Sequence, residues 1–386
     1  MVNRIVLNET SYFGAGAISV ITDEIKQRGF KKAFVVTDKD LIKFNVAQKV
    51  TKLLDAADVP YELYDNVKAN PTIQNVQTGV QKFKASNADV LIAIGGGSPI
   101  DTAKGIGIVA NNSEFADVKS LEGVAATKNR SVPIIAVPTT AGTAAEVTIN
   151  YVITDESAVK KMVCVDPKDI PVLAVIDPEM MTSMPKGLTA ATGMDALTHA
   201  IEGYITKGAW VLTDMFELKA MELIAKHLPK AVAEPNNIEA RDGMGTAQYI
   251  AGMGFSNVGL GIVHSMAHSL GAVYDTPHGV ANALLLPYVM EYNASATGEK
   301  YREIARNLGV ADVDSMTADE YRKAAVDAVV ALSKTVGIPQ KLIEIGAKEE
   351  DLARLAKLAY NDVCTPGNPR DTNEAEILEI YKKAFK

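Results

Sequence analysis

The first half of the chain alternates short runs of apolar residues with segments of helical, amphipathic periodicity. The apolar runs are rich in β-branched residues and lack strict alternation with polar ones, which is typical of strands buried on both faces of a parallel sheet. We predict strands at residues 32–38, 89–94, 132–137 and 172–176. Amphipathic helices are predicted between them, for example at residues 18–28 and 72–85.

The pattern changes near residue 182. Strand-like runs give way to periodic segments rich in Ala, Leu and Met, which favour helices. We therefore predict an α/β domain with a parallel sheet at residues 1–183 and an all-helical domain at residues 184–386. The sequence Pro185-Lys186-Gly187 is interpreted as a hinge between them.

Composition narrows the range of partners. A length of 386 residues suits two domains, and 47% hydrophobic with 22% charged residues suits a folded globular protein. The net charge of −8 argues against nucleic acid, and the sequence has no apolar run long enough to cross a membrane. The chain has only two cysteines, Cys164 and Cys364, which we interpret as reduced thiols of a cytoplasmic protein.

A glycine-rich turn follows the second predicted strand, within residues 94–101. Ser98 is a suitable N-cap, Pro99 suits the first helical position, and Asp101 complements the positive end of the helix. Three glycines let exposed N–H groups approach an anion such as a pyrophosphate. The alternative is a tight turn without a ligand. The spacing differs from the G-x-G-x-x-G fingerprint, so an ordinary Rossmann domain is not the best template.

Two further segments are candidates for contact with a nucleotide. Asp38 ends the first predicted strand, where a carboxylate is suited to the ribose hydroxyls, although a solvated loop carboxylate is the common alternative. Residues 137–146 follow another strand and combine hydroxyl-bearing with small side chains, which suits a phosphate loop as well as a simple turn.

All histidines lie in the second half of the chain. Asp195 and His199 are four residues apart, so a helix would place them on one face, one turn apart. His264 and His268 repeat this spacing, and His278 follows in a turn-like stretch. One carboxylate and three neutral imidazoles suit Fe(II), Zn(II) or another divalent transition metal. The spacing does not decide whether His264 or His268 is the ligand.

The alternative for any of these histidines is a hydrogen-bonded core residue. Clustering favours the metal for His199, His264, His268 and His278, whereas His227, near a predicted helix end, is expected to be such a core residue.

Taken together, these segments resemble the iron-dependent, group III, alcohol dehydrogenases, over essentially the whole chain. The densest similarity lies at residues 95–101, 138–143, 193–203 and 254–279. The resemblance implies an N-terminal dinucleotide-binding α/β domain and an all-helical, metal-binding C-terminal domain, the fold shared with dehydroquinate synthase. It also implies hydride transfer between NAD(H) and a small alcohol or aldehyde, and a homodimer joined through the N-terminal strands.

The resemblance further implies a role for particular residues. It makes Asp195, His199, His264 and His278 the metal ligands and leaves His268 unligated beside the nicotinamide and substrate, as a candidate for relaying a proton. Positions on the cofactor side are Asp38, Asn70, Gly96, Gly97, Ser98, Thr139, Thr140, Thr143 and Lys161. Positions lining the substrate pocket are Asn150, Val152 and Phe255.

The resemblance, together with the pocket residues that it implies, makes lactaldehyde and glycolaldehyde the expected substrates, or 1,2-propanediol and ethylene glycol in the reverse direction. Asn150 beside apolar Val152 and Phe255 would hydrogen-bond a hydroxyl next to the reacting carbon. The alternatives are a broad primary alcohol dehydrogenase, a non-redox lyase of the dehydroquinate synthase type, and a non-catalytic metal- or nucleotide-binding protein. The lyase is disfavoured because the helical metal segments are poor in the Lys and Arg that a phosphorylated substrate needs.

Overall fold

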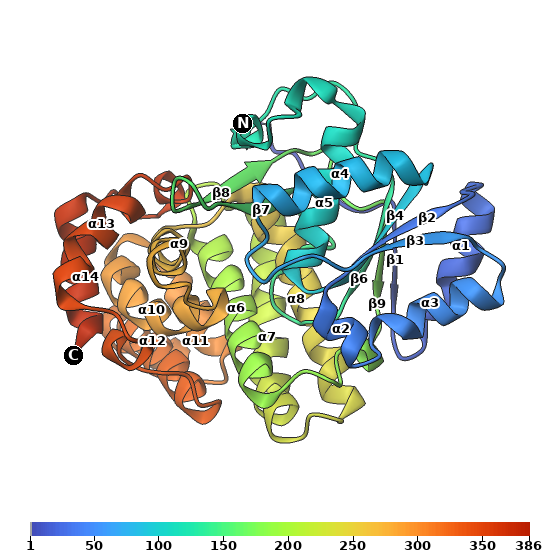
Figure 1. The fold of residues 1–386 in the computed structure, drawn as a ribbon. Coiled ribbons are helices and arrows are strands. Elements are labelled where there is room, and N and C mark those ends of the chain that lie inside the picture. Colours follow the sequence, from blue (N-terminus) through green and yellow to red (C-terminus); the bar gives the residue numbers. More distant parts are fainter. Residues whose placement is uncertain (1) are drawn as a thin grey trace. The chain divides into compact units, whose positions relative to one another are not determined.

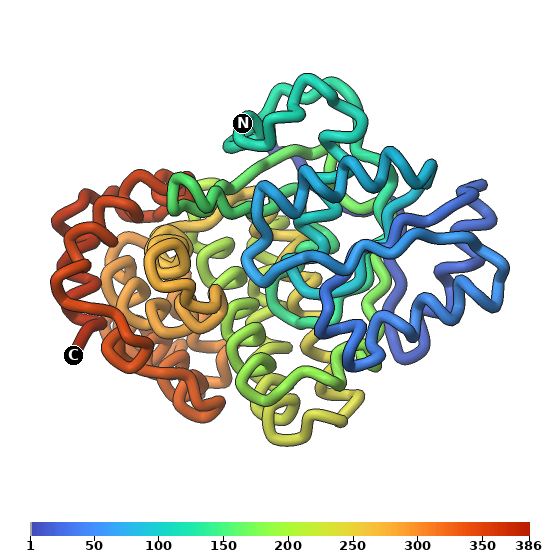
Figure 2. Tube along the Cα trace, in the orientation of Figure 1, coloured from blue at the N-terminus to red at the C-terminus, as the bar shows by residue number. Residues whose placement is uncertain are grey.

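The computed structural model describes residues 2–386 and divides into two compact units, Met1–Met184 and Pro185–Lys386. The units follow one another along the chain without interleaving (Figure 2). The first contains a parallel sheet flanked by helices, and the second is helical (Figure 1). The predicted fold class is therefore confirmed.

The main sheet of the first unit has six strands, all parallel, in the order β1-β9-β6-β4-β2-β3. The four predicted strands form its centre, where burial on both faces gives the strongest sequence signal. The sequence analysis missed the two edge strands, which are short and only partly buried. The strands are β1 (Thr10–Phe13), β2 (Ala33–Val36), β3 (Tyr61–Tyr64), β4 (Val90–Gly95), β6 (Ile134–Pro138) and β9 (Leu173–Ile176).

Side chains of the central strands point alternately into two hydrophobic cores, one on each face of the sheet. On β2, Phe34 and Val36 join one core, whereas Ala33 and Val35 join the other. Helices α4 (Ile73–Ser86) and α5 (Gly97–Asn111) cover the first face, and α1 (Ile21–Arg28) and α3 (Ala47–Ala56) cover the second. The short helix α2 (Lys39–Lys43) follows β2.

A second, three-stranded sheet was not predicted. It has the order β5-β8-β7, with β5 at Gly123–Val124, β7 at Asn150–Asp155 and β8 at Lys160–Val165. Strands β7 and β8 form an antiparallel hairpin. Burial alternates along β7, so Tyr151 and Ile153 face the core and Asn150 and Val152 lie on the other, partly exposed face.

Residues 2–9 alternate apolar and polar side chains, a pattern typical of a strand, but the structure differs from that pattern. Residues 2–9 form no strand among the described residues, and Met1 lies outside them. Within the described chain the first strand begins at Thr10, which pairs with Leu173 of β9. An alternating pattern alone does not form a strand, because the backbone groups need a neighbouring strand with which to pair.

The second unit contains nine α-helices and, within its residues 185–386, no strand. Pro185, in the segment interpreted as a hinge, is the N-cap of the first helix, and the boundary between the two units falls immediately before it, whereas Lys186 and Gly187 are helical. The helices are α6 (Lys186–Ile205), α7 (Val211–Ala233), α8 (Ile238–Val258), α9 (Ile262–Tyr274), α10 (His278–Asn293), α11 (Lys300–Asn307), α12 (Ala318–Thr335), α13 (Leu352–Tyr360) and α14 (Glu374–Phe385).

Short 3-10 helices complete the connections between these elements. They are η1 (Ala17–Val20), η2 (Ser113–Phe115), η3 (Val118–Leu121), η4 (Pro178–Met180), η5 (Ala294–Ala296), η6 (Val313–Ser315), η7 (Leu342–Ile345), η8 (Glu349–Asp351) and η9 (Thr365–Gly367). Within residues 2–386, no helix has the length and apolar character needed to cross a membrane.

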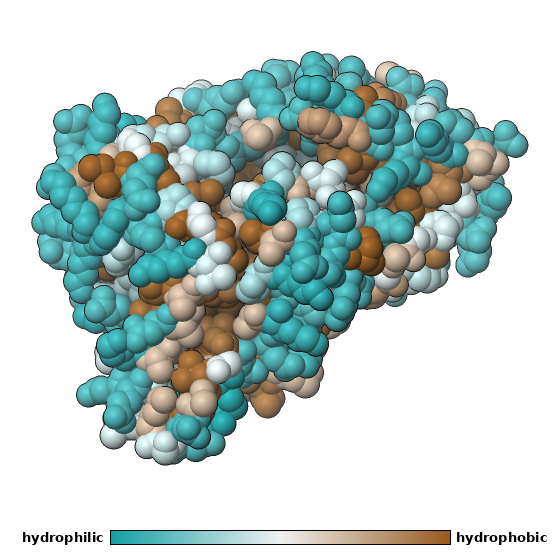
Figure 3. Space-filling model, turned by 90° about the horizontal axis from the view of Figure 1, so that it is seen from below, coloured by the Kyte–Doolittle hydropathy of each residue, from teal (hydrophilic) through white to brown (hydrophobic). Residues whose placement is uncertain are grey.

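Hydrophilic residues dominate the face drawn in Figure 3, with hydrophobic areas between them. Exposed large apolar side chains occur in both units, for example Phe44 and Val211. Such exposure is ordinary, because a globular protein has too little polar surface to cover all of its apolar atoms.

Candidate active site

Three helices of the second unit bring four side chains together. Asp195 and His199 lie one turn apart on α6, His264 is in the first turn of α9, and His278 is the first residue of α10. One carboxylate oxygen and one nitrogen of each imidazole all lie within 4.8 Å of one another. Asp195, His199 and His264 are buried. Residues 275–277 of the stretch predicted to be turn-like lie outside the helices, and α10 begins at His278.

Two glycines allow the backbones that carry these side chains to approach closely. A Cβ on Gly279, next to His278, would lie 2.5 Å from the carbonyl oxygen of Ala191 on α6. A Cβ on Gly261, the N-cap of α9, would lie 2.9 Å from Oε1 of Glu202. Contacts this short leave room only for glycine, so the close approach of α9 and α10 to α6 depends on these two positions.

Asn282 marks the point on which the acceptor atoms converge. Its side-chain Nδ2 donates to Oδ1 of Asp195 at 2.7 Å and lies 3.2 Å from Nε2 of His264 and 3.1 Å from Nε2 of His278. Asn282 is fully buried and lies one helical turn after His278 on α10. Three acceptor atoms directed at one donor have the arrangement that a metal cation requires, so these residues fit a metal.

His264 is oriented by a buried carboxylate. Its Nδ1 lies 2.6 Å from Oε2 of Glu202, which also accepts from the backbone N–H of His264 at 3.3 Å, while Oε1 accepts from that of Val263 at 2.7 Å. Burial raises the pKa of Glu202 to about 7, and burial lowers the pKa of His264 well below its usual range. His264 is therefore neutral, and the pairing at Nδ1 leaves its Nε2 for a metal.

His268 lies one turn further along α9 and is not part of this set of four. Its ring stacks on that of His278, with 5.4 Å between the ring centroids, and its Nδ1 lies 2.9 Å from Oδ2 of Asp362. His227 lies on α7, where its ring packs against Gly243 of α8, and it is not a member of the cluster.

Phe255 of α8 covers one member of the metal cluster. Its ring stacks on His199 with 4.2 Å between centroids and an interplanar angle of 15°. Phe255 is buried, so its ring shields the imidazole from solvent. Of the predicted substrate residues, Phe255 belongs to the second unit, whereas Asn150 and Val152 belong to the first.

In the first unit, several predicted cofactor residues gather at the carboxyl edge of the main sheet. Strands β2, β4 and β6 are neighbours and parallel, so the segments that follow them emerge side by side. Ligands of open α/β sheets bind at this edge. The segments contribute Asp38, then Gly96, Gly97 and Ser98, then Thr139, Thr140 and Thr143.

The glycine turn and the threonine loop touch each other. The Thr139 N–H donates to the Gly95 carbonyl at 2.9 Å. A Cβ on Gly96 would lie 3.0 Å from Oγ1 of Thr140, and one on Gly97 would lie 3.1 Å from Cγ2 of Thr143. A side chain at either glycine would therefore press tightly on a threonine of the other loop, and bare backbone leaves this edge room for a close approach.

The start of α5 differs from the prediction. The helix begins at Gly97 with Gly96 as its N-cap, so Ser98 and Pro99 lie within the first turn. Glycine adopts the extended N-cap conformation readily, and Pro99 has no N–H to leave unpaired there. Asp101 lies beyond the first turn and accepts from the backbone N–H of Val152 at 3.0 Å, so it does not serve the helix end as predicted.

Asp38 also has a structural role, as the cap of a helix. It is the N-cap of α2, and its Oδ1 accepts from the backbone N–H of Leu41 at 2.8 Å. The side chain is partly buried, and this burial raises its pKa. Asp38 thus ends the strand segment as predicted but also caps the following helix.

The remaining predicted residues lie on or near the small sheet. Lys161 of β8 donates from Nζ to Oδ1 of Asn70 at 2.9 Å, so these two cofactor candidates are paired. The Asn150 carbonyl accepts from Nζ of the fully buried Lys104 at 2.8 Å. Lys104 and Asp101 both belong to α5, so the helix that begins at the glycine turn also fixes Asn150 and Val152.

The sequence analysis missed three residues of the metal region, of which two had a signal. Glu202 lies seven residues after Asp195 and Asn282 four after His278, both helical spacings that share a face. Asp362 had none, because it lies in a turn after α13, far in sequence from His268.

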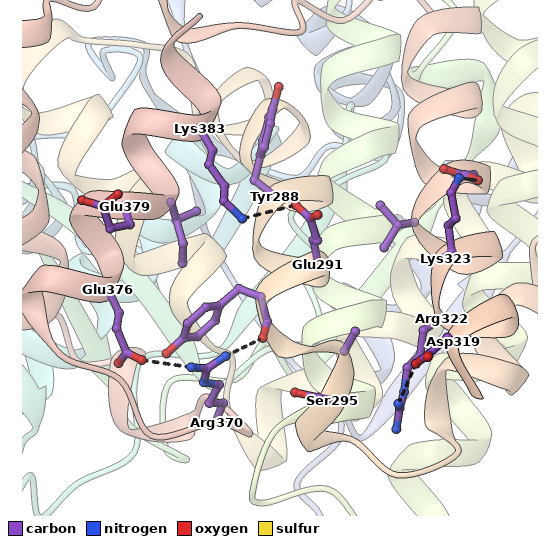
Figure 4. Close-up of a pocket in the computed structure, with 15 residues that line it drawn as sticks. Tyr288, Glu291, Ser295, Asp319, Arg322, Lys323, Arg370, Glu376, Glu379 and Lys383 are labelled. Atoms are coloured by element: carbon purple, nitrogen blue, oxygen red, sulfur yellow. Dashed lines mark hydrogen bonds and ion pairs between the residues drawn. The ribbon is translucent and has the colours of Figure 1, made fainter. Parts of the chain in front are cut away.

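A separate hollow lies among α10, α12 and α14 (Figure 4). Two labelled pairs of opposite charge point toward one another: Arg370 pairs with Glu376, and Lys383 pairs with Glu291 (Figure 4). None of the predicted site residues lines this hollow. Its charges are engaged in mutual ion pairs on the surface, so it has no evident part in the chemistry.

The chain belongs to the iron-containing alcohol dehydrogenase family. Residues 8–178 match the family model for iron-containing alcohol dehydrogenase, and residues 189–385 match that for the C-terminal part of the Fe-containing alcohol dehydrogenase family. The class predicted from the sequence is thereby confirmed.

Similar proteins cover the chain from end to end. It is 59% identical over 385 residues to lactaldehyde reductase of Escherichia coli K12, covering 100% of both chains. It is 43% identical to NAD-dependent methanol dehydrogenase of Bacillus methanolicus, covering 97% of this chain and 98% of that protein. A crystal structure of 1,3-propanediol oxidoreductase superposes with a TM-score of 0.96 at 42% identity, covering 100% of both chains.

Proposed function

We propose that this protein interconverts lactaldehyde and 1,2-propanediol, and also glycolaldehyde and ethylene glycol, by hydride transfer to or from NAD(H). In this proposal the unit Met1–Met184 binds NAD(H) and the unit Pro185–Lys386 binds a divalent metal, Fe(II) first, with Zn(II) as the alternative. The protein acts in the cytoplasm as a homodimer joined through its N-terminal strands.

The observation that carries the proposal is the convergence of Asp195, His199, His264 and His278 in a largely buried cluster beside His268. A fourfold set of one carboxylate and three imidazoles is costly to bury unless its lone pairs are satisfied, and a divalent cation satisfies all four at once. The resemblance to a lactaldehyde reductase over the full chain supports the choice of substrate.

The metal and the nicotinamide of NAD(H) would supply the reactive groups. When bound, the metal acts as a Lewis acid toward the substrate oxygen, and the nicotinamide exchanges the hydride with the carbinol carbon. The protein would hold the metal through the four ligands. Phe255, stacked on His199, would exclude water from the metal region.

His268 would carry the proton. Its Nδ1 faces Asp362, which leaves Nε2 as the nitrogen able to exchange a proton with substrate or a cofactor hydroxyl. His268→Ala should keep its metal and lose about 10²-fold in rate, the lower end for a positioned acid–base group.

Asn150 would select the substrate. Its amide would hydrogen-bond the hydroxyl next to the reacting carbon, and apolar Val152 and Phe255 are the other two residues proposed to contact the substrate. A substrate without that hydroxyl leaves the amide unpaired, at a cost of about 1–3 kcal/mol. Lactaldehyde should therefore exceed propanal roughly ten- to a hundredfold in kcat/KM.

The test is NADH oxidation by the Fe(II)-loaded protein with lactaldehyde, propanal and butanal in parallel. Asn150→Val should erase much of the gap between lactaldehyde and propanal, with lactaldehyde losing more. Val152→Ala is the matched control, because it alters the same face of β7 without removing a polar group. Equal turnover of butanal and lactaldehyde would identify a broad primary alcohol dehydrogenase, and no turnover of any aldehyde would refute redox function.

A further inference from the structure

The strongest unassigned feature is the second carboxylate–histidine pair on α9. His268 and Asp362 lie 2.9 Å apart, from Nδ1 to Oδ2. His268 is buried, and the side chain of Asp362 is only 11% exposed. A buried pair at this distance is not a surface contact that solvent would compete away.

Asp362 is itself held in place by its own turn. Its Oδ1 accepts from the backbone N–H of Cys364 at 2.9 Å and from the Ser265 hydroxyl at 3.4 Å. The backbone carbonyl of Asp362 accepts from the N–H of Thr365 at 3.2 Å. With Oδ1 engaged by the turn, Oδ2 is the oxygen that faces Nδ1 of His268.

The charge of Asp362 suits the same arrangement. Burial alone would raise its pKa, but His268 and the N–H and thiol of Cys364 lower it to about 2. Asp362 is therefore an anion that accepts hydrogen bonds and donates none. An imidazole facing such a group carries its proton on the facing nitrogen.

We propose that Asp362 is the positioning residue of His268, fixing its proton on Nδ1 and its orientation so that Nε2 is the nitrogen that relays the proton. The proposal deepens the proposed function and rests on it for the role of His268. Asp362 does not itself touch substrate or cofactor in this scheme. It acts by excluding the other neutral form of the imidazole, in which Nε2 is already protonated.

Asp362→Asn tests the tautomer directly. The asparagine Oδ1 can still accept from Cys364 N–H, which directs its NH₂ group toward His268. An NH₂ donor there requires a bare Nδ1 and so moves the imidazole proton to Nε2. The substitution keeps the size of the side chain and the turn, and it inverts the hydrogen bond to His268.

The first measurement is ¹⁵N NMR of the Zn(II)-loaded, histidine-labelled protein, because Zn(II) is diamagnetic. The chain has 5 histidines, and the signals missing from His268→Ala identify His268. The proposal expects a protonated Nδ1 and a bare Nε2 in the wild type, and the reverse in Asp362→Asn. A wild-type His268 protonated on Nε2 would overturn it, and so would an unchanged tautomer in the variant.

The second measurement separates positioning from structural damage. Asp362→Asn should lower kcat by up to about 10²-fold, with metal content unchanged and a smaller effect on the aldehyde KM. In a His268→Ala background, the same substitution should cost nothing further. An additive loss in the double variant would refute action through His268.

The matched control is Asp351→Asn. Asp351 is also a carboxylate close to α13 that accepts from a side chain of α9, the Tyr274 hydroxyl, but it does not contact a histidine. Its variant should keep the wild-type kcat and His268 spectrum. If the wild type reduces no aldehyde, the proposed function fails, whereas the NMR spectra still decide the role of Asp362.

Discussion

The carboxyl edge of the main sheet and the metal cluster are built from different parts of the chain. At the sheet edge, bare backbone at Gly96 and Gly97 lies against the threonine loop, and an added Cβ would press tightly against it. In the metal cluster, side chains from three helices supply every donor atom, and all of them are buried except the partly exposed His278. A site made of backbone should be damaged by added atoms, and a site made of side chains by lost ones.

The largest effect should follow from removing a donor of the metal cluster. Asp195→Ala and His264→Ala should each lose the metal and nearly all activity, because each takes away one of four converging ligands. Metal analysis and aldehyde reduction by the purified variants check this expectation.

His227→Gln is the control for removing a buried histidine, since His227 lies outside the cluster. It should keep both metal and activity. If His264 were an ordinary core residue, His264→Ala would unfold the protein instead of leaving a folded protein without metal. Stoichiometric metal in His264→Ala, with none in His268→Ala, would mean that the two histidines exchange roles.

A smaller effect should follow from changing Glu202, which orients the candidate ligand His264 but is not itself one of the four ligands. Glu202→Gln leaves all four candidate ligands in place but weakens the acceptor at Nδ1 of His264. Loss of such an outer partner typically costs 10- to 100-fold in metal affinity. Competition with a chelator, followed on the purified protein, gives the affinity without reference to activity.

Glu217→Gln is the matched control for Glu202→Gln. Glu217 is a fully buried carboxyl group on α7 whose pKa burial raises well above its usual range, but it pairs with no histidine. Its variant should bind metal as the wild type does. Equal weakening in both variants would show that any buried carboxyl in this bundle supports the metal only through stability.

The same contrast explains what the sequence could predict. Strands β4 and β6 were predictable because they are buried on both faces, and the α6 pair Asp195 and His199 because helical spacing is local. The β7–β8 hairpin was missed, although β7 alternates, because half of its residues are only partly buried. Local pattern therefore predicts elements and shared faces.

What local pattern could not predict was the partner of each polar group. Glu202 was visible as a neighbour of Asp195 on one helical face, but its pairing with His264 depends on the close approach of α9 at Gly261. Asp362 pairs with His268 across 94 residues of sequence. Asp101 matched a helix-end pattern, yet it serves Val152 on a strand that the sequence analysis had not found.

At the sheet edge, an added methyl group should matter more than a lost hydroxyl. Gly97→Ala should weaken NADH binding by about tenfold, because its Cβ would press on Thr143 and strain of this kind costs about 1–3 kcal/mol. Ser98→Ala is the control and should cost less if the backbone makes the contacts. Titration of NADH into the metal-loaded variants measures both, and a larger loss in Ser98→Ala would reverse the assignment.

The smallest expected effect concerns the choice between NAD and NADP. A carboxylate at Asp38, near the ribose, would repel a 2′-phosphate, so the unmodified protein should prefer NAD. Asp38→Gly should narrow that preference roughly fivefold, as expected for about 1 kcal/mol between two solvated charges about 4 Å apart. Glycine is a suitable replacement because it serves as an N-cap at a cost of only a few tenths of a kcal/mol, so α2 should survive the loss of the bond to Leu41.

Asp40→Asn is the control: it removes a neighbouring carboxylate of the same helix and should leave the preference for NAD over NADP unchanged. The ratio of kcat/KM for the two cofactors is the measurement, and comparable values in the unmodified protein would contradict any role of Asp38 in discrimination. In that case the Asp38 side chain would only cap α2, and the cofactor contacts at this edge would come from the backbone at Gly96 and Gly97.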